Sequence, residues 1–371
     1  MTQIELSRGV LSLQLTESTW PLADLLGFAE RVNPKRAFLF VSKVLGRHIP
    51  VAPATMRHAF TDLANQIPDG LAEPILLVGM AETAVGLAAG VHQVLQQRYP
   101  QTLYLATTRH PIDAPLWAEF REEHSHAPAH LLYGSDDPLI QAQLAQVKTL
   151  VLVDDEASTG QTFVNLAQAL RREQLPNLQQ VITATLADWA PPLHFDGLAH
   201  QAVSLLKGQW SWQDHPNAVV PHMPDVAAVA HGEWPLPRQQ TWGRQPTLTP
   251  YATLHATAQH GERILVLGSN ELVWAPFVLA EQLAAQGAVV KFAATTRSPI
   301  ALGHDVRTAF RFADQYGLGM INFIYNVDPS AYDRVIWVIE TATDSVDPAW
   351  WTWIPQLEVI SLSEQEAVCS H

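Results

Sequence analysis

One run near the middle of the chain constrains its fold more than any other. An apolar stretch at 149–153 predicts a buried strand, and two acids, Asp154 and Asp155, stand at its end. A loop of small residues at 157–162 leads into an apolar pattern at 163–170 that predicts a helix. Such a unit can bind a sugar phosphate, because the acids accept hydrogen bonds from hydroxyls and the groups at the helix start surround a phosphate.

The residues of this run also bear on other roles. An Asp-Asp pair followed by Ser-Thr-Gly can be a helix N-cap and no more, and for the pair alone that is the preferred interpretation. The twelve-residue pattern at 151–162 as a whole favours a binding site. A P-loop needs Gly-Lys-Ser/Thr, and no lysine stands here. A Rossmann site needs Gly-x-Gly-x-x-Gly after a strand, and this sequence has no such motif.

The run resembles the motif with which type I phosphoribosyltransferases bind 5-phosphoribosyl 1-pyrophosphate (PRPP). That motif is a hydrophobic strand, two acids, two variable residues and then small-Thr-Gly-x-Thr. The resemblance implies that Asp154 and Asp155 hold the ribose hydroxyls and act in catalysis, with Mg²⁺ bound mainly through the substrate. It also implies that the following loop holds the 5′-phosphate. The loop comprises Ala157, Ser158, Thr159, Gly160, Gln161 and Thr162.

The composition bounds the class of protein. The chain has 371 residues, enough for two domains, and is 47% hydrophobic and 16% charged, as expected of a globular protein. Its formal charge of −14 argues against nucleic acid as the main partner. With one cysteine, Cys369, it has no disulfide framework within the chain. We find neither a signal-peptide pattern nor an apolar run of about 20 residues that would span a membrane, and expect a soluble cytoplasmic protein.

Strand and helix patterns alternate in the first half of the chain. Predicted strands lie at 75–78, 102–107, 149–154 and 180–186, and predicted helices lie near 54–66, 83–98, 138–146 and 161–173. This alternation predicts a parallel sheet with helices on both faces. Ligands of such sheets bind beyond the carboxyl ends of the strands, where the acid pair is expected.

The chain also contains two copies of one sequence pattern. Residues 75–82 are echoed by 264–271, and 106–112 by 294–300, in the same order and at nearly constant spacing. We therefore predict an α/β fold of two tandem, duplicated parallel-sheet units of type I phosphoribosyltransferase-like topology. The second is degenerate, because Thr341 replaces the second acid after Glu340, and Pro348, which has no N–H to donate, stands in its phosphate loop.

The whole chain resembles bacterial phosphoribosyltransferase-like proteins of tellurite-resistance (stress-response) gene clusters. These join an orotate-phosphoribosyltransferase-like domain to a C-terminal domain named for a Thr-Arg-Ser-Pro motif, here 296–299. We predict a phosphoribosyltransferase domain with an N-terminal hood at 1–235 and a TRSP domain at 236–371. The Pro- and Trp-rich connector, roughly 187–245, is expected to be ordered, with a short hairpin near 203–212.

The same resemblance places pyrophosphate at the loop after the first predicted strand, where a strained cis peptide bond is hypothesised; an ordinary strand–helix turn is the alternative. The segment 107–131 is rich in basic residues and longer than an ordinary connection, which predicts a mobile lid. Arg109 is its best candidate for a catalytic pyrophosphate contact, because a guanidinium matches phosphate geometry. His124 and His126 in this segment favour a solvated loop over a metal site. The pyrophosphate-binding candidates are Gly79, Met80, Ala81, Glu82, Thr83 and Thr108.

Two further groups of residues have alternative roles. Arg36, Lys43 and Arg47, with His48, are candidate cations of a hood over the acceptor, or basic residues of a solvated edge strand. The second group either holds a second phosphorylated ligand in the C-terminal copy or caps helices and joins the domains. It comprises Glu271, Thr296, Arg297 and Ser298.

The expected function is Mg²⁺-dependent transfer of the phosphoribosyl group from PRPP to a small-molecule acceptor, with release of pyrophosphate, in making a nucleoside-like metabolite. Enzymes that act on 6-oxopurines carry an Asp at the position of Ser158, so hypoxanthine and guanine are disfavoured acceptors. A non-catalytic PRPP sensor is the alternative. Orotate-type enzymes commonly dimerise across their active sites, so a homodimer is also considered.

Overall fold

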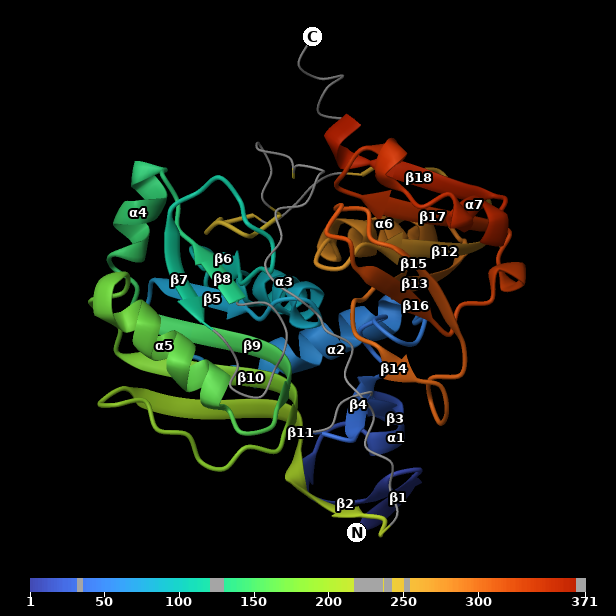
Figure 1. Cartoon of the computed structure of the whole chain (residues 1–371). Coiled ribbons are helices and arrows are strands. Elements are labelled where there is room, and N and C mark those ends of the chain that lie inside the picture. Colours follow the sequence, from blue (N-terminus) through green and yellow to red (C-terminus); the bar gives the residue numbers. More distant parts are fainter. Residues whose placement is uncertain (32–35, 121–129, 217–235, 237–241, 250–253, 365–371) are drawn as a thin grey trace.

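The computed structural model describes residues 1–31, 36–120, 130–216, 236, 242–249 and 254–364. The chain forms two α/β units that lie side by side, with helices α2 (Pro53–Gln66) and α3 (Ala84–Leu95) between their sheets (Figure 1). Among the described helices, none is long and apolar enough to span a bilayer.

The N-terminal unit is built on one seven-stranded sheet. In spatial order its strands are β1 (Thr2–Leu6), β2 (Gly9–Ser18), β11 (Ala199–Asp214), β10 (Gln180–Asp188), β9 (Thr149–Ala157), β5 (Ile75–Gly79) and β6 (Leu103–Ala106). The strands from β11 to β6 are parallel, and β2 pairs antiparallel with β11. The run that carries the acid pair is therefore a central strand, β9, between β10 and β5.

Helices cover both faces of this sheet, as the alternating pattern predicts. Val151 and Val153 of β9 pack in the same core as α2 and α3. Leu150 and Leu152 face the opposite side, where they pack with α4 (Pro138–Leu144) and α5 (Gln161–Glu173). The four predicted strands and four predicted helices of this unit are thus confirmed, with small differences at their ends.

The predicted hairpin near 203–212 is wrong. Residues 199–214 form the single long strand β11, which pairs with β10 along its first half and with β2 along its second half. The strand continues because β2 supplies a second partner from the N-terminus, and a register shift at Lys207/Gly208 accommodates the change. The start of the predicted connector is therefore part of the first sheet. The predicted domain boundary near 235 lies outside the described residues.

The segment predicted to be a lid is partly regular structure. Strand β7 (Leu116–Phe120) pairs antiparallel with β8 (His130–Tyr133), so the described ends of this segment form a two-stranded ribbon and not an open loop. The intervening residues 121–129, with Arg121, His124 and His126, lie outside the described residues.

The C-terminal unit has a four-stranded parallel sheet. Its order is β13 (Val289–Ala294), β12 (Arg263–Gly268), β17 (Arg334–Ile339) and β18 (Leu357–Ser361). This order matches β6-β5-β9-β10 of the first unit, and α6 (Trp274–Ala285) follows β12 as α3 follows β5. An antiparallel ribbon of β15 (Ala309–Ala313) and β16 (Ile321–Tyr325) corresponds to β7 and β8. Short elements complete the unit: η1 (Pro329–Ala331), η2 (Thr343–Ser345) and α7 (Ala349–Trp353).

A small sheet connects the two units at the expected hood. The short helix α1 (Leu22–Leu25) precedes β3 (Leu26–Arg31), which pairs with β4 (Phe38–Ser42) on one side and with β14 (Ile300–Ala301) of the C-terminal unit on the other. The hood region is therefore part of the contact between the units. All five residues of β4 are buried.

Candidate active site

The acid pair lies at the carboxyl end of β9. Both side chains are half-buried, and the Asp155 N–H donates to Asp154 Oδ1 at 2.9 Å. Burial raises the pKa of Asp155, and the neighbouring Glu156 raises it further; the hydrogen bond from Asp154 and the charge of Arg31 act in the opposite direction. A carboxylate in this environment is stabilised by any cation or hydroxyl that binds it.

The loop after the acid pair has the geometry expected of an anion-binding turn. Gly160 is the N-cap of α5, with φ of 69° in the left-handed region that favours glycine. A Cβ at this position would lie 2.5 Å from Leu193 Cδ2, so the close approach of the 189–195 segment also requires glycine. The loop thus leads directly into the N-terminus of a 13-residue helix, whose amides and dipole favour an anion.

Arg36, one of the predicted hood cations, contacts this loop. Its guanidinium donates to Ser158 Oγ at 3.1 Å and to Glu156 Oε1 at 2.8 Å, and Ser158 Oγ donates to the same Glu156 oxygen at 2.6 Å. The guanidinium also lies 4.7 Å from the centroid of the Phe38 ring. Arg36 therefore joins the hood strand β4 to the loop.

The other two predicted hood cations have different surroundings. Lys43 Nζ donates to the carbonyl of Ala23 and lies 3.7 Å from Asp305 Oδ1, so its contacts are away from the acid pair. Arg47 is 3% exposed and donates to the carbonyl of Glu82 and to the carbonyl of Thr295 in the C-terminal unit. It is a buried cation between the units and not part of a solvated edge.

The loop predicted to bind pyrophosphate connects β5 to α3. Met80 N–H donates to the Val153 carbonyl at 3.0 Å, and Ala81 N–H donates to Thr107 Oγ1 at 2.8 Å, so the loop lies next to the acid-bearing strand. Among the described residues the cis peptide bond is Glu73–Pro74, so the hypothesised cis bond at 79–82 is wrong. The unusual conformation is instead at Glu82, whose φ is 66°.

Glu82 is surrounded by arginines. Its Oε1 lies 3.1 Å from Arg297 Nη2 and 3.5 Å from Arg109 Nε, and Arg47 binds its carbonyl. Burial alone would raise the pKa of Glu82, but Arg297, Arg109, Arg47 and His130 outweigh burial and lower it to about 2. The structure thus brings together Arg109 and Glu82, as predicted, and adds Arg297 from the other unit. We refer to Arg47, Arg109, Arg297 and Glu82 as the arginine cluster.

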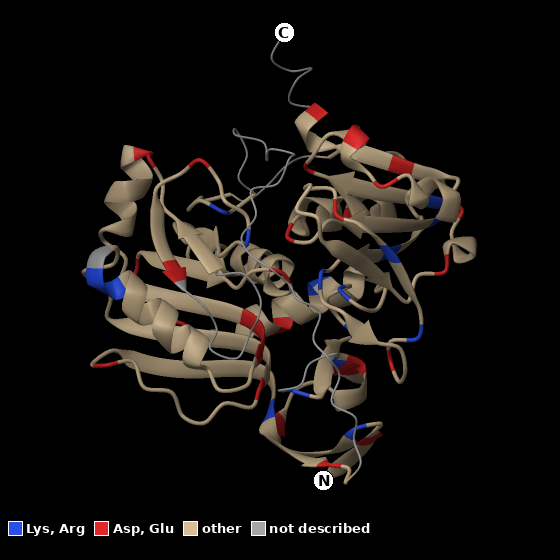
Figure 2. Cartoon of the chain, viewed as in Figure 1, with Lys and Arg blue, Asp and Glu red and all other residues tan. Residues whose placement is uncertain are grey.

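Glu271 joins the units in the reverse direction. Its carboxylate accepts from Thr108 Oγ1 at 2.6 Å and from Arg109 N–H at 2.7 Å, both in the N-terminal unit. Thr296 Oγ1 accepts from Ser298 N–H at 3.2 Å. Of the two alternatives for this second group, the contacts of Glu271 favour a role in joining the units. Figure 2 shows acidic and basic residues in the region where the two units meet.

Two features of the site were missed by the sequence reasoning. Arg244 is 3% exposed and forms a bidentate pair with Glu340, at 2.8 and 2.9 Å. The sequence contains a feature that could have identified Arg244. Gly46-Arg47 is repeated as Gly243-Arg244, and each pair lies upstream of one of the two matched patterns.

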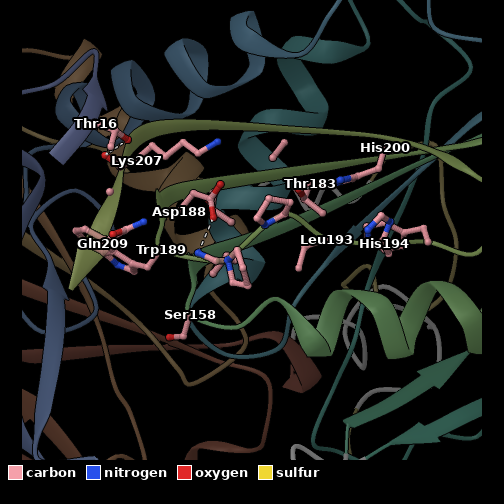
Figure 3. Close-up of a pocket in the computed structure, with 18 of the residues that line it drawn as sticks. Thr16, Ser158, Thr183, Asp188, Trp189, Leu193, His194, His200, Lys207 and Gln209 are labelled. Atoms are coloured by element: carbon pink, nitrogen blue, oxygen red, sulfur yellow. Dashed lines mark hydrogen bonds between the residues drawn. The ribbon is translucent and has the colours of Figure 1, made fainter. Parts of the chain in front are cut away.

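The second missed feature is a cavity of about 970 Å³ beside the loop (Figure 3). Ala157 and Ser158 form one edge of it, and Trp189, Trp210 and Asp188 line it together with residues of β10 and β11. Asp188 Oδ1 accepts from Ala190 N–H at 3.0 Å, and burial raises the pKa of Asp188. The sequence pattern at 189–192 indicates only a connector.

Comparisons with known proteins agree with the motifs. A family model described as "Phosphoribosyl transferase" matches residues 25–207, and one described as "TRSP domain C terminus to PRTase_2" matches residues 237–349. A comparison with curated proteins found no match.

Among solved structures, adenine phosphoribosyltransferase from Thermoanaerobacter pseudethanolicus is 17% identical with a TM-score of 0.29, over 42% of this chain and 81% of that one. Orotate phosphoribosyltransferase from Aeropyrum pernix is 16% identical with a TM-score of 0.27, over 45% and 78%. Adenine phosphoribosyltransferase from Trypanosoma brucei is 11% identical with a TM-score of 0.35, over 55% and 87%. The assignment rests on the two family models and on the motifs that they contain: the chain belongs to the family in which a phosphoribosyltransferase unit is followed by a TRSP domain.

Proposed function

We propose that the N-terminal unit transfers the phosphoribosyl group of PRPP to a small-molecule acceptor and releases pyrophosphate. The observation that carries this proposal is the position of the acid pair relative to the arginine cluster. Val153 and Gly79 are register partners on the adjacent strands β9 and β5, so Asp154 lies beside the start of the 80–82 turn, where β5 ends. A ribose-binding acid pair and a pyrophosphate-binding cationic centre need this proximity, because both groups belong to one PRPP molecule.

Each part of PRPP has residues suited to it. Asp154 and Asp155 accept hydrogen bonds from the ribose hydroxyls, and the amides at 158–162 with the α5 dipole bind the 5′-phosphate. Arg109 and its neighbours bind the pyrophosphate, since guanidinium groups form charge-assisted hydrogen bonds to phosphate oxygens. Burial lowers the pKa of Arg47, so an anion bound beside this cation would stabilise its charged form.

The acid pair fits Mg²⁺. This metal prefers oxygen ligands and is commonly bound through one or two carboxylates together with substrate phosphates. The half-buried Asp155, whose pKa is raised, is a carboxylate that a cation would stabilise. No group of three or more His, Cys, Asp or Glu side chains that could hold a metal ion occurs in the described part of the chain. When bound, Mg²⁺ would neutralise charge on the pyrophosphate oxygens.

In the reaction, the bond from ribose C1 to pyrophosphate breaks and its electron pair leaves with pyrophosphate. A lone pair of the acceptor forms the new bond to C1, through an oxocarbenium-like transition state. The contribution of the chain is to position PRPP and to stabilise the charge that develops on the leaving group. Arg109, whose backbone N–H donates to Glu271, is positioned to stabilise the charge on the departing pyrophosphate.

The acceptor is proposed to bind in the cavity beside Ser158. It adjoins the phosphate loop, and its Trp189 and Trp210 offer aromatic surface to a flat heterocycle. Asp188 offers an acceptor for an N–H or amino group. Ser158 cannot exchange a proton with a purine at neutral pH as an aspartate can, so hypoxanthine and guanine remain disfavoured.

Two measurements test this proposal. Calorimetry measures PRPP binding, and an assay of pyrophosphate release measures turnover in a mixture of PRPP, Mg²⁺ and a metabolite extract. Replacing both acids by Asn (Asp154→Asn, Asp155→Asn) should abolish PRPP binding, whereas Asp136→Asn, at an exposed position, should bind as the wild type does. Unchanged affinity in the double variant rejects the site. Tight PRPP binding without pyrophosphate release under any acceptor favours the sensor instead.

A further inference from the structure

The two units contact each other through equivalent residues. Glu82 follows β5 and pairs with Arg297 of the C-terminal unit, while Glu271 follows β12 and binds Thr108 and Arg109 of the N-terminal unit. Glu82 and Glu271 are matching positions of the repeat, as are Arg109 and Arg297. The contacts are therefore reciprocal, which is the property of a two-fold interface between like subunits.

The backbone repeats the same exchange. Gly46 belongs to the first unit, and its carbonyl accepts from Ala294 N–H on β13 at 2.9 Å. Gly243 precedes the second unit, and its carbonyl accepts from Ala106 N–H on β6 at 2.7 Å. Both glycines have φ in the left-handed region, 68° and 87°, and both face an aromatic ring, Phe292 or Tyr104, that leaves no room for a Cβ. Each unit thus adds a segment to the edge of the other unit's sheet.

The charges on the two sides of this interface are opposite. On the N-terminal side the arginine cluster has three arginines around one glutamate, Glu82. On the C-terminal side one arginine, Arg244, binds two glutamates, Glu271 and Glu340. Tyr316 OH also donates to Glu340, at 2.7 Å. Around Glu82 the arginines outnumber the carboxylate that they contact, which suits a polyanion, whereas the carboxylates around Arg244 outnumber their arginine and are already paired with it.

From these contacts we propose that the C-terminal unit is a built-in partner subunit that completes the N-terminal site, and that Arg297 binds the same pyrophosphate group as Arg109. This inference rests on the proposed function for the identity of the substrate. Arg297 is 9% exposed and reaches across the interface to the turn that follows β5. Glu271 is a positioning residue, because its two hydrogen bonds fix the backbone and side-chain positions at 108–109. The second copy has lost its own acid pair but supplies a cation and a carboxylate to the first.

The probe is inorganic pyrophosphate with Mg²⁺, titrated into the full-length chain by calorimetry. Arg297→Gln should weaken pyrophosphate binding roughly 10- to 100-fold, as expected for the loss of a charge-assisted hydrogen bond to a phosphate. Arg307→Ala removes an exposed arginine of the same unit and should bind within about twofold of the wild type, the scatter expected when no charge-assisted contact is lost. Arg297→Lys should recover part of the affinity, because it restores the charge without the planar fork.

A second variant separates anion binding from a merely structural ion pair. Glu82→Gln removes the carboxylate that competes with pyrophosphate for the same arginines, so it should tighten pyrophosphate binding severalfold while Arg297→Gln weakens it. If Arg297 served only to pair with Glu82, both variants would lower the thermal unfolding temperature alike and neither would change pyrophosphate affinity; that result overturns the inference.

The remaining outcomes are also decisive. Wild-type affinity in a folded Arg297→Gln variant overturns the inference, and so does a wild-type chain that does not bind pyrophosphate. PRPP binding that depends on Asp154 and Asp155 but not on Arg297 leaves the proposed function standing without the inference. Pyrophosphate binding that depends on Arg297, in a chain that does not bind PRPP, supports the anion centre and rejects the proposed function.

Discussion

Arg244 and Glu340 form a buried bidentate ion pair at the place in the C-terminal unit that corresponds to the acid pair of the N-terminal unit. The two N–O distances are 2.8 and 2.9 Å, and the side chains are 3% and 0% exposed. Burial by itself would raise the pKa of Glu340, but Arg244 outweighs burial and lowers it. The pair explains in physical terms why one unit has a candidate site and the other does not: the remaining acid is already neutralised from within the chain.

Removing one partner of this pair should strongly destabilise the protein. Arg244→Met leaves Glu340 buried without the cation that pairs with it, and such changes cost about 3–5 kcal/mol. Chemical denaturation at pH 7 measures the loss. The matched control is the exposed bidentate pair of Arg263 with Asp333, 50% and 46% exposed, where Arg263→Met should leave the unfolding midpoint unchanged. Equal losses at the two pairs would contradict this account.

The phosphate loop should not tolerate a side chain at Gly160. Gly160→Ala forces an L-residue into the left-handed region, at about 1–2 kcal/mol, and displaces Leu193 from the loop. The control is Gly197→Ala, where φ is 75° but no atom lies within 4 Å of the added Cβ. Both variants should lose stability, and only Gly160→Ala should also weaken PRPP binding. Measuring unfolding free energy and PRPP affinity on both proteins separates backbone strain from damage to the loop.

Stability should fall as the solution is acidified below pH 6.5. Burial lowers the pKa of His92 to about 4, and also lowers the pKa of His48 and His110. Each native histidine therefore binds fewer protons than its unfolded form between its native pKa and about 6.5, so stability is lost as pH falls through this window.

His92 is the clearest residue with which to measure this effect. Its Nε2 lies 2.8 Å from the Thr102 carbonyl, away from the candidate site. Between pH 6.5 and 5.0 it should account for about 1.6 kcal/mol, because the slope rises toward about 1.4 kcal/mol for each pH unit only as the unfolded histidine becomes fully protonated. In His92→Gln the fall in unfolding free energy over this range should be smaller by that amount. A pH profile identical to that of the wild type would show that His92 is not held neutral.

Arg36 should matter for turnover more than for stability. Arg36→Met removes the contacts to Glu156 and Ser158, and a partly exposed ion pair of this kind contributes about 1 kcal/mol. The phosphate loop loses its link to β4, so the KM for PRPP should rise severalfold. Lys43→Met, from the same predicted set of hood cations, contacts Ala23 and Asp305 instead and should leave that KM unchanged. Equal effects of the two changes would show that Arg36 and Lys43 act alike, as the sequence prediction of hood cations has it.

Much of this protein is determined by local sequence. The strand 149–157, the helix that begins at Gln161 and the turn at Gly160 follow from apolar periodicity and from residues whose backbone preferences are local. The repeat is also visible in the sequence, because matching residues occur in the same order. The strand that carries the acid pair, the loop that leads into α5 and the family could therefore be predicted before any contact was known.

The tertiary structure decided which of these residues meet. Arg297 and Glu82 are 215 residues apart in the chain, and no periodicity reports a contact over that separation. The hairpin at 203–212 was predicted wrongly for the same reason, since the strand that pairs with the second half of β11 comes from residues 9–18. That Glu340 is neutralised by an arginine could likewise not be predicted from the sequence around it. Its partner Arg244 approaches from the edge of the other unit's sheet. Local preferences form the elements, whereas burial of their apolar faces and pairing of their buried charges select the partners.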